Sequence, residues 1–203
     1  MTPLLTGLGL AAAAGWNAWA VLLFFNGVVR LLPQDFPGPT ASFLSSPPVL
    51  QIALVLFLAE FIVGKIPVVD RLWELGQTLL RPLAGALLAL AASAGTTPAA
   101  LAATAAGGAA STLAAHLVKS TTRWTSTAAT RGFAQLALSL AEDVVAIVLA
   151  ILVFFVPWFS VVLLVALAVL LVTHRVSVGH AVRVLFLRLQ HPRRALRQAA
   201  RRG

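Results

Sequence analysis

Residues 132–158 form a long apolar run that contains two adjacent acids, Glu142 and Asp143. A helix crosses the hydrocarbon core of a bilayer with roughly 20 mostly apolar residues, so this run is long enough to span a membrane. An ionisable side chain at membrane depth costs about 2.5–3.5 kcal/mol on insertion scales. Two such groups side by side need a partner or a purpose. The run therefore predicts a membrane helix that carries a polar centre.

The composition agrees with a membrane protein. Of the 203 residues, 60% are hydrophobic and only 10% are charged, whereas a soluble domain carries about 25% charged residues. Cysteine is absent, which excludes disulfides and thiolate metal sites. The net charge is +9, and eight of the fifteen Lys and Arg residues follow His174 in a tail without acids. Cations that flank apolar spans favour a membrane surface over nucleic acid as the partner.

Six apolar spans are expected, so the predicted fold is an all-α, polytopic membrane bundle over residues 1–173. The spans are residues 6–31, 47–66, 79–94, 99–118, 132–158 and 159–172. The fourth is the least apolar, and either a full crossing or a re-entrant segment fits it. Residues 32–46 are predicted as a loop, 68–78 as a helix in the membrane interface, and 119–131 as a polar, basic loop. Residues 174–203 form a basic, amphipathic tail. The N-terminus has no positively charged leader region, so it is expected to begin the first retained span.

The charge distribution orients these spans. With six crossings, fourteen of the fifteen cations fall on one side of the membrane, and only Arg30 falls on the other. Loops rich in Lys and Arg remain in the cytoplasm. The expected topology therefore places both termini in the cytoplasm.

A weak internal repeat relates the two halves, about 5–95 and 99–173. A shift of 82 residues places Glu60 on Glu142, within the similar segments LVLFLAE and LALSLAE. Three spans in each half would make the halves run in opposite directions, a construction common in secondary transporters with a midplane site. The prediction is a 3+3 inverted repeat.

Glu60 and Glu142 are the central candidates for a binding site. Both are expected near the middle of the membrane, where two facing carboxylates share a proton or hold a cation. The structural alternative is an ion pair or hydrogen bond that only fixes helix packing. Asp143 points about 100° away from Glu142 on a helix, so both acids cannot face one partner, and one of them is expected to bond Asn17, His116 or a backbone donor.

Further polar residues are candidates for the same site. Asn17, after Gly15, marks either a broken helix that lines a cavity or ordinary close packing. Lys65 either neutralises Glu60 or extends to the interface. His116 and Lys119 either relay protons or bind an anion at the site, or lie at the membrane interface. The candidates for contact with anionic lipid headgroups are Arg71, Arg81, Arg123, Arg183 and Arg188. No metal centre or cofactor is expected, and hydrolase and nucleotide-binding motifs are absent.

Several short motifs resemble one bacterial membrane family. They are GLGLAAAAGWNAW at 7–19, Glu60-Phe61 with Lys65-Ile66-Pro67 and Asp70, RPLAGA at 81–86, the spacing of His116, Lys119 and Arg123, and SLAED at 139–143. Over about residues 5–173 the chain resembles domain-of-unknown-function family 4126. It departs from the family at Ala18, where Pro is usual, and at Gly64, where an acid is usual. The resemblance implies a bacterial inner-membrane protein without a known activity.

The expected function is therefore that of a small transporter, flippase or channel, not an enzyme. Its carboxylates would handle a proton, a cation, or a lipid or other small molecule. The alternative is a membrane scaffold or assembly factor with internally paired acids and a tail that recruits lipid or partners. Expected partners are the bilayer and anionic headgroups, without nucleic acid, and a homo-oligomer is left open.

Overall fold

The computed structural model describes residues 2–64, 67–93, 97–127 and 133–173, and these are almost entirely helical, without strands. This confirms the all-α class. The elements are α1 (Thr2–Ala14), α2 (Ala18–Leu31), the short 3-10 helix η1 (Pro33–Asp35), α3 (Pro39–Leu44), α4 (Pro47–Val63), α5 (Pro67–Ala92), α6 (Pro98–Thr127), α7 (Phe133–Phe155) and α8 (Phe159–Thr173).

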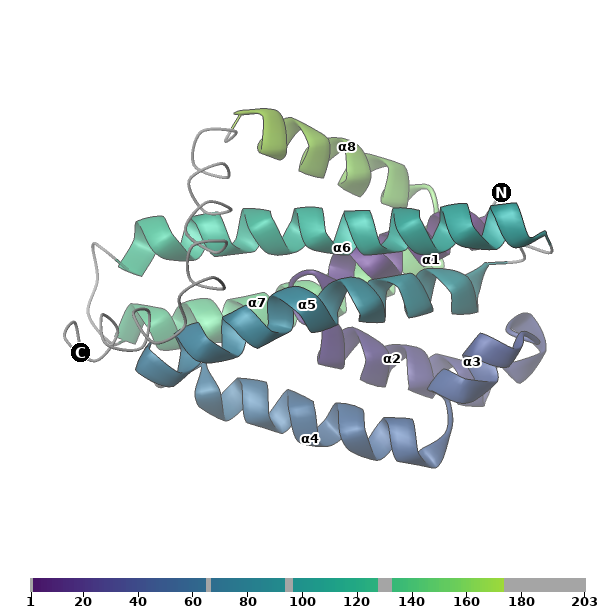
Figure 1. Ribbon diagram of the computed structural model, residues 1–203, viewed down its shortest axis with the longest axis horizontal. Helices are drawn as coiled ribbons and strands as arrows, with labels where there is room; N and C mark the ends of the chain where they lie inside the picture. Colours follow the sequence, from purple (N-terminus) through teal and green to yellow (C-terminus); the bar gives the residue numbers. More distant parts are fainter. Residues whose placement is uncertain (1, 65–66, 94–96, 128–132, 174–203) are drawn as a thin grey trace.

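The first apolar stretch is broken into two helices that run in opposite directions (Figure 1). The α1 helix is antiparallel to α5, because Gly7 lies against Ala89 while the Gly15 carbonyl accepts a hydrogen bond from Arg81. The prediction of one continuous span over residues 6–31 is therefore wrong. The chain enters the bundle along α1 and turns at residues 15–17.

The α2 helix then returns towards the end of the bundle where α1 began. It runs parallel to α7: Asn17 at its start bonds to Asp143 early in α7, and the ring of Phe24 packs on Phe154 near the end of α7. The α3 helix lies at this end, which we call the α3 end (Figure 1). Five long helices, α4 to α8, then run lengthwise in alternating directions. The last, α8, ends away from the α3 end.

Three further boundaries differ from the expectation. The loop predicted at 32–46 contains η1 and α3, and Pro39 begins α3 in a first-turn position that suits proline. The interfacial helix and the third span form one helix, α5, with Pro82 inside it. The predicted loop at 119–131 is helical as far as Thr127. The polar residues that suggested interface or loop, such as Gln77 and Lys119, are instead buried against other helices.

The predicted repeat does not carry over to the helix boundaries. A shift of 82 residues moves Gly64, which ends α4, onto Ala146 inside the continuous helix α7. It also moves the α7–α8 break onto residues 74–76 inside α5. The α4 and α7 helices do run in opposite directions (Figure 1), but the folded-back α1–α2 pair has no counterpart in α6.

Small residues let the helices approach closely around α1, which packs against α5, α6, α7 and α8. Leu10 and the four alanines that follow it are completely buried. Where α5 crosses α6, a Cβ on Gly85 would lie 2.9 Å from the Gly108 carbonyl oxygen and would overlap Thr112. Helices in contact at backbone distance leave no space for larger side chains.

The interior is mostly apolar but also contains several charged side chains, while many large apolar side chains are exposed on the outside. Buried polar residues include Glu60, Arg81, His116, Lys119 and Glu142. Large apolar side chains are instead exposed along the outer faces of α4, α7 and α8, among them Ile52, Val55, Ile62, Val144, Val148, Phe155, Val162, Val165, Val169 and Val172. Within the described residues, one helical segment, Pro98–Ser120, is long and apolar enough to cross a membrane, and several shorter apolar helices surround it.

Candidate functional site

The break between α1 and α2 positions the polar centre of the bundle. Asn17 has an extended backbone (φ −148°, ψ 104°), and its side-chain oxygen accepts hydrogen bonds from the Trp19 and Ala20 amides at 3.1 and 3.0 Å. It thus caps the first turn of α2. Its amide nitrogen donates to Asp143 Oδ1 at 2.7 Å. Asn17 is therefore the partner of Asp143, one of the alternatives left open for the two acids, and the helix is broken at this residue.

Two buried cations satisfy the carbonyls that the break exposes. Arg81, from α5, donates to the Gly15 carbonyl oxygen at 3.1 Å, and Lys119, from α6, donates to the Trp16 carbonyl oxygen at 2.6 Å. The side chains of Arg81 and Lys119 are only 1% and 2% exposed. The C-terminal end of a helix carries partial negative charge, which favours cations at this position.

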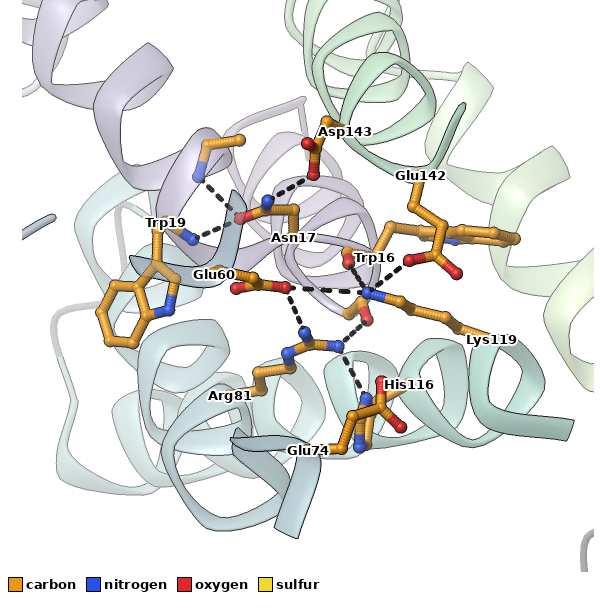
Figure 2. A network of polar contacts seen from close by, with 12 residues as sticks. Trp16, Asn17, Trp19, Glu60, Glu74, Arg81, His116, Lys119, Glu142 and Asp143 are labelled. Carbon is orange, nitrogen blue, oxygen red and sulfur yellow. Dashed lines mark hydrogen bonds and ion pairs between the residues drawn. The ribbon is translucent and has the colours of Figure 1, made fainter. Parts of the chain in front are cut away.

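Two buried carboxylates compensate these cations (Figure 2). Glu60 Oε1 lies 2.6 Å from Arg81 and 3.7 Å from Lys119 Nζ. Glu142 Oε2 lies 3.1 Å from the same Nζ. Lys119 therefore joins the two glutamates, which come from α4 and α7. Removing one member of a buried ion pair costs about 3–5 kcal/mol, because the remaining charge has left water without a partner.

His116 extends the network from Arg81 towards α5. Its Nδ1 lies 2.7 Å from Arg81 Nη1, and its Nε2 lies 3.1 Å from Thr78 Oγ1. A guanidinium only donates hydrogen bonds, so Nδ1 must be the acceptor. Thr78 Oγ1 donates to the Glu74 carbonyl at 2.8 Å, which leaves it to accept from Nε2–H. His116 is thereby assigned as the neutral tautomer with its proton on Nε2.

A small cavity of about 10 Å³ adjoins these groups. It is lined by Glu60, Gly64, Trp73, Glu74, Arg81, Ser139, Glu142 and Asp143. This volume admits roughly one water molecule. Within the described residues, Glu60 Oε2 and Arg81 Nε are buried and form no hydrogen bond. The other polar atoms of Glu60 and Arg81 have partners that follow from the helix break, whereas Glu60 Oε2 and Arg81 Nε do not.

Comparison with known families places the chain. The family model described as Domain of unknown function (DUF4126) matches residues 4–176. The chain belongs to this family. Neither the curated proteins nor the solved structures contain a match to it.

In this DUF4126 protein, most of the predicted site residues converge. The structure brings Asn17, Glu60, Glu142 and Asp143 together with His116 and Lys119. The interfacial interpretations of His116 and Lys119 are wrong, because both are only 2% exposed. Their partners lie in α4, α5, α7 and the break between α1 and α2.

Arg81 needs the largest correction among the predicted lipid contacts. It was expected to bind headgroups at the surface, but it is 1% exposed and paired with Glu60. Lys65, Arg183 and Arg188 lie outside the described residues. Arg71 and Arg123 fall in α5 and α6, but their side chains are likewise outside the part that the structure describes.

Sequence reasoning did not identify Glu74, Thr78 or the carbonyls of Gly15 and Trp16 as parts of the network. A signal for the α5 residues was present: positions 74, 77, 78 and 81 are polar at helical spacing, as are 112, 116, 119 and 120 in α6. Such a stripe indicates one buried face of a helix. The stripe at 74, 77, 78 and 81 was not recognised, because the prediction divided these residues between an interfacial helix at 68–78 and a span at 79–94. The two carbonyls could be identified only if the position of the helix break were known, because every residue has a backbone carbonyl and the sequence does not mark the ones without a helical partner.

Proposed function

We propose that this DUF4126 protein is a bacterial inner-membrane protein in which α4 to α8 cross the bilayer and α1–α2 form a re-entrant pair. The exposed apolar faces of α4, α7 and α8 and the polar interior support this proposal. Non-helical backbone at membrane depth is tolerated only where protein surrounds it. The break at residues 15–17 meets this condition, because Arg81, Lys119 and its own Asn17 satisfy it.

The orientation follows from the positive charges. No Lys or Arg precedes Arg30, so replacing six crossings by five moves only the N-terminus to the other side. Lys65, Arg71, Arg123, Arg131 and the tail stay together, and the positive-inside rule assigns them to the cytoplasm. The proposed topology has the N-terminus in the periplasm and residues 174–203 in the cytoplasm. The expectation that both termini are cytoplasmic is replaced by this arrangement.

The function that the geometry supports best is proton-coupled or proton-conducting transport, with Glu60 as the acceptor. Glu60 Oε1 holds Arg81 and Lys119, whereas Oε2 is buried beside the cavity without a hydrogen bond in the described structure. A proton can therefore be added at Oε2 without displacing either cation. Glu74, Glu142 and Asp143 line the same cavity, whose volume holds roughly one water molecule, so further carboxylates border the space beside Glu60. The small volume suits a proton or small cation rather than a lipid.

Proton flux into liposomes that contain the purified protein tests this function. We expect Glu60→Gln and Glu142→Gln each to lower the flux at least about tenfold, since a group that transfers protons contributes about 10²–10⁴-fold to a rate. Asp35→Asn is the matched control, because Asp35 is exposed in η1, away from the site. A pH-sensitive dye inside the liposomes reports the flux under an imposed potential.

Unchanged flux in both glutamine variants, or no flux in the wild type, would overturn the proposal. That outcome favours the scaffold alternative, in which the ion pairs only stabilise the broken helix. The scaffold alternative has one specific observation in its favour: each of the two buried cations contacts a carbonyl at the break. It predicts that the loss of residues 177–203 impairs function, and that glutamine at position 60 or 142 lowers the stability of the fold without changing a proton flux.

A further inference from the structure

The ammonium group of Lys119 occupies a set of oxygens drawn from three separate parts of the chain. Nζ lies 2.6 Å from the Trp16 carbonyl oxygen, 3.1 Å from Glu142 Oε2 and 3.7 Å from Glu60 Oε1 (Figure 2). The carbonyl follows the C-terminal end of α1, where the helix dipole is negative. Exposed carbonyls of broken membrane helices coordinate monovalent cations in transporters with this construction. The ligand set is therefore that of a cation site filled by a side chain.

A second observation indicates that this site accepts more than Lys119. Glu60 is one of the oxygen donors, and its other oxygen, Oε2, is buried without a hydrogen bond within the described residues. Glu60 and Glu142 both line the cavity, so two of the three residues that surround Nζ also border a small space.

We propose that these oxygens form a site for a monovalent cation of ammonium size, for which Lys119 and a free cation compete. The free cation is a primary ammonium group or an alkali ion of similar radius. Exchange replaces one positive charge by another, so Glu60 and Glu142 remain compensated. Within the described residues no cluster of three metal-ligating side chains exists, which argues against a divalent ion. The inference rests on the proposed transport function and specifies its substrate class.

Removing the tethered ammonium exposes the site to a test. In Lys119→Ala, methylammonium chloride is expected to raise Tm by at least about 2 °C, since a bound cation stabilises the folded state by mass action. Choline chloride at the same concentration is the control for ionic strength, because its trimethylated head is too large. Lys119→Met fills the space without a charge and should not respond, and the wild type should respond less than Lys119→Ala because its tethered ammonium competes for the site. The Lys119→Ala, Glu142→Gln double variant should lose the response.

Equal effects of methylammonium and choline on Lys119→Ala would overturn the inference. Potassium chloride separates the two sources of cation, since a rise in Tm with methylammonium alone assigns the site to organic ammonium groups. If Lys119→Ala does not fold, uptake of radioactive rubidium by wild-type proteoliposomes decides: uptake that Glu142→Gln abolishes supports the site, and no uptake overturns it. Proton flux in the wild type, with no rise in the Tm of Lys119→Ala on addition of methylammonium, refutes the cation site alone. A rise in Tm without proton flux supports the cation site and refutes proton transport.

Discussion

At the residue scale, the buried charges are tied to a single backbone event. Two carbonyls and the first amides of α2 lose their helical partners at residues 15–17. Arg81 and Lys119 satisfy the carbonyls, Asn17 satisfies the amides, and Glu60 and Glu142 compensate the cations. The exposed carbonyls require the buried cations, and the cations require the buried carboxylates, because an unpaired charge or carbonyl away from water costs several kcal/mol. The atoms left over are Glu60 Oε2 and Arg81 Nε, and the proposed function depends on the first of them.

Arg81→Gln tests how much the folded state depends on this arrangement. The substitution leaves Glu60 without its 2.6 Å partner and weakens contact with the Gly15 carbonyl, so we expect a loss of about 3–5 kcal/mol. Arg30→Gln is the control: Arg30 is exposed, and its contacts with Asn26 and the Ser45 carbonyl are worth about 1 kcal/mol or less. Denaturant unfolding in detergent measures both. Equal stability of the two variants would show that the Arg81 contacts are dispensable.

The sequence was sufficient for part of this site. Intramembrane acids are rare, so Glu60 and Glu142 were identified as central, and the helical angle between Glu142 and Asp143 gave them different partners. Arg81 was misassigned because an arginine beside Pro82 at the start of an apolar run is typical of a membrane interface. Only the continuous helix α5 reveals that Arg81 lies on the same face as Glu74 and Gln77.

At the element scale, close contact between small residues determines how α5 and α6 pack. Gly85 and Gly108 bring the two backbones together, and this contact holds Arg81 beside His116. The sequence did not predict this contact, because Gly85 lies in a run of small residues that fits many surfaces. The fold-back of α1 on α2 was also beyond the sequence, since a 26-residue, mostly apolar stretch is long enough to cross a membrane without a turn, and its two asparagines do not identify a break.

Two glycines of α5 provide a matched pair for this packing. Gly85→Ala places a Cβ against Gly108 and Thr112, so we expect a loss of about 1–3 kcal/mol from overpacking. Gly76→Ala has open space around its Cβ and should stabilise the helix by about 0.5–1 kcal/mol. Thermal unfolding in detergent compares them. If Gly85→Ala is as stable as Gly76→Ala, α5 and α6 do not pack at backbone distance.

At the scale of the whole molecule, charge segregation did not determine the number of crossings. Five crossings with a re-entrant pair and six crossings would assign each cation to the same side in both arrangements, because the first cation of the chain, Arg30, lies in the last turn of α2. The charge rule therefore supports the orientation of α4 to α8 and is silent on the N-terminus. The predicted repeat rested on one short Leu-rich motif that contains a Glu. Such a motif can occur twice in a chain whose two halves have different helix boundaries.

Val165→Arg distinguishes a membrane protein from a helical protein in water. Val165 is 57% exposed near the middle of α8. In a bilayer we expect the arginine to cost about 2.5–3.5 kcal/mol and to reduce the amount of inserted protein, whereas on a surface in water its effect stays within about 0.5 kcal/mol. Quantitative membrane extraction with Val165→Leu as the control measures the difference. Normal yield of Val165→Arg would contradict lipid contact along α8.

The central claim is that Glu60 takes up the proton that the protein handles, and infrared difference spectroscopy of the carboxyl groups tests it most directly. On acidification of the reconstituted wild type, we predict the C=O band of a newly protonated, buried carboxyl. The band should be missing in Glu60→Gln and retained in Asp35→Asn, because Glu60 Oε2 is a buried carboxylate oxygen without a hydrogen bond in the described residues, and Glu60 lines the cavity, whereas Asp35 is exposed. A band that persists unchanged in Glu60→Gln, or no such band in the wild type, would contradict the account.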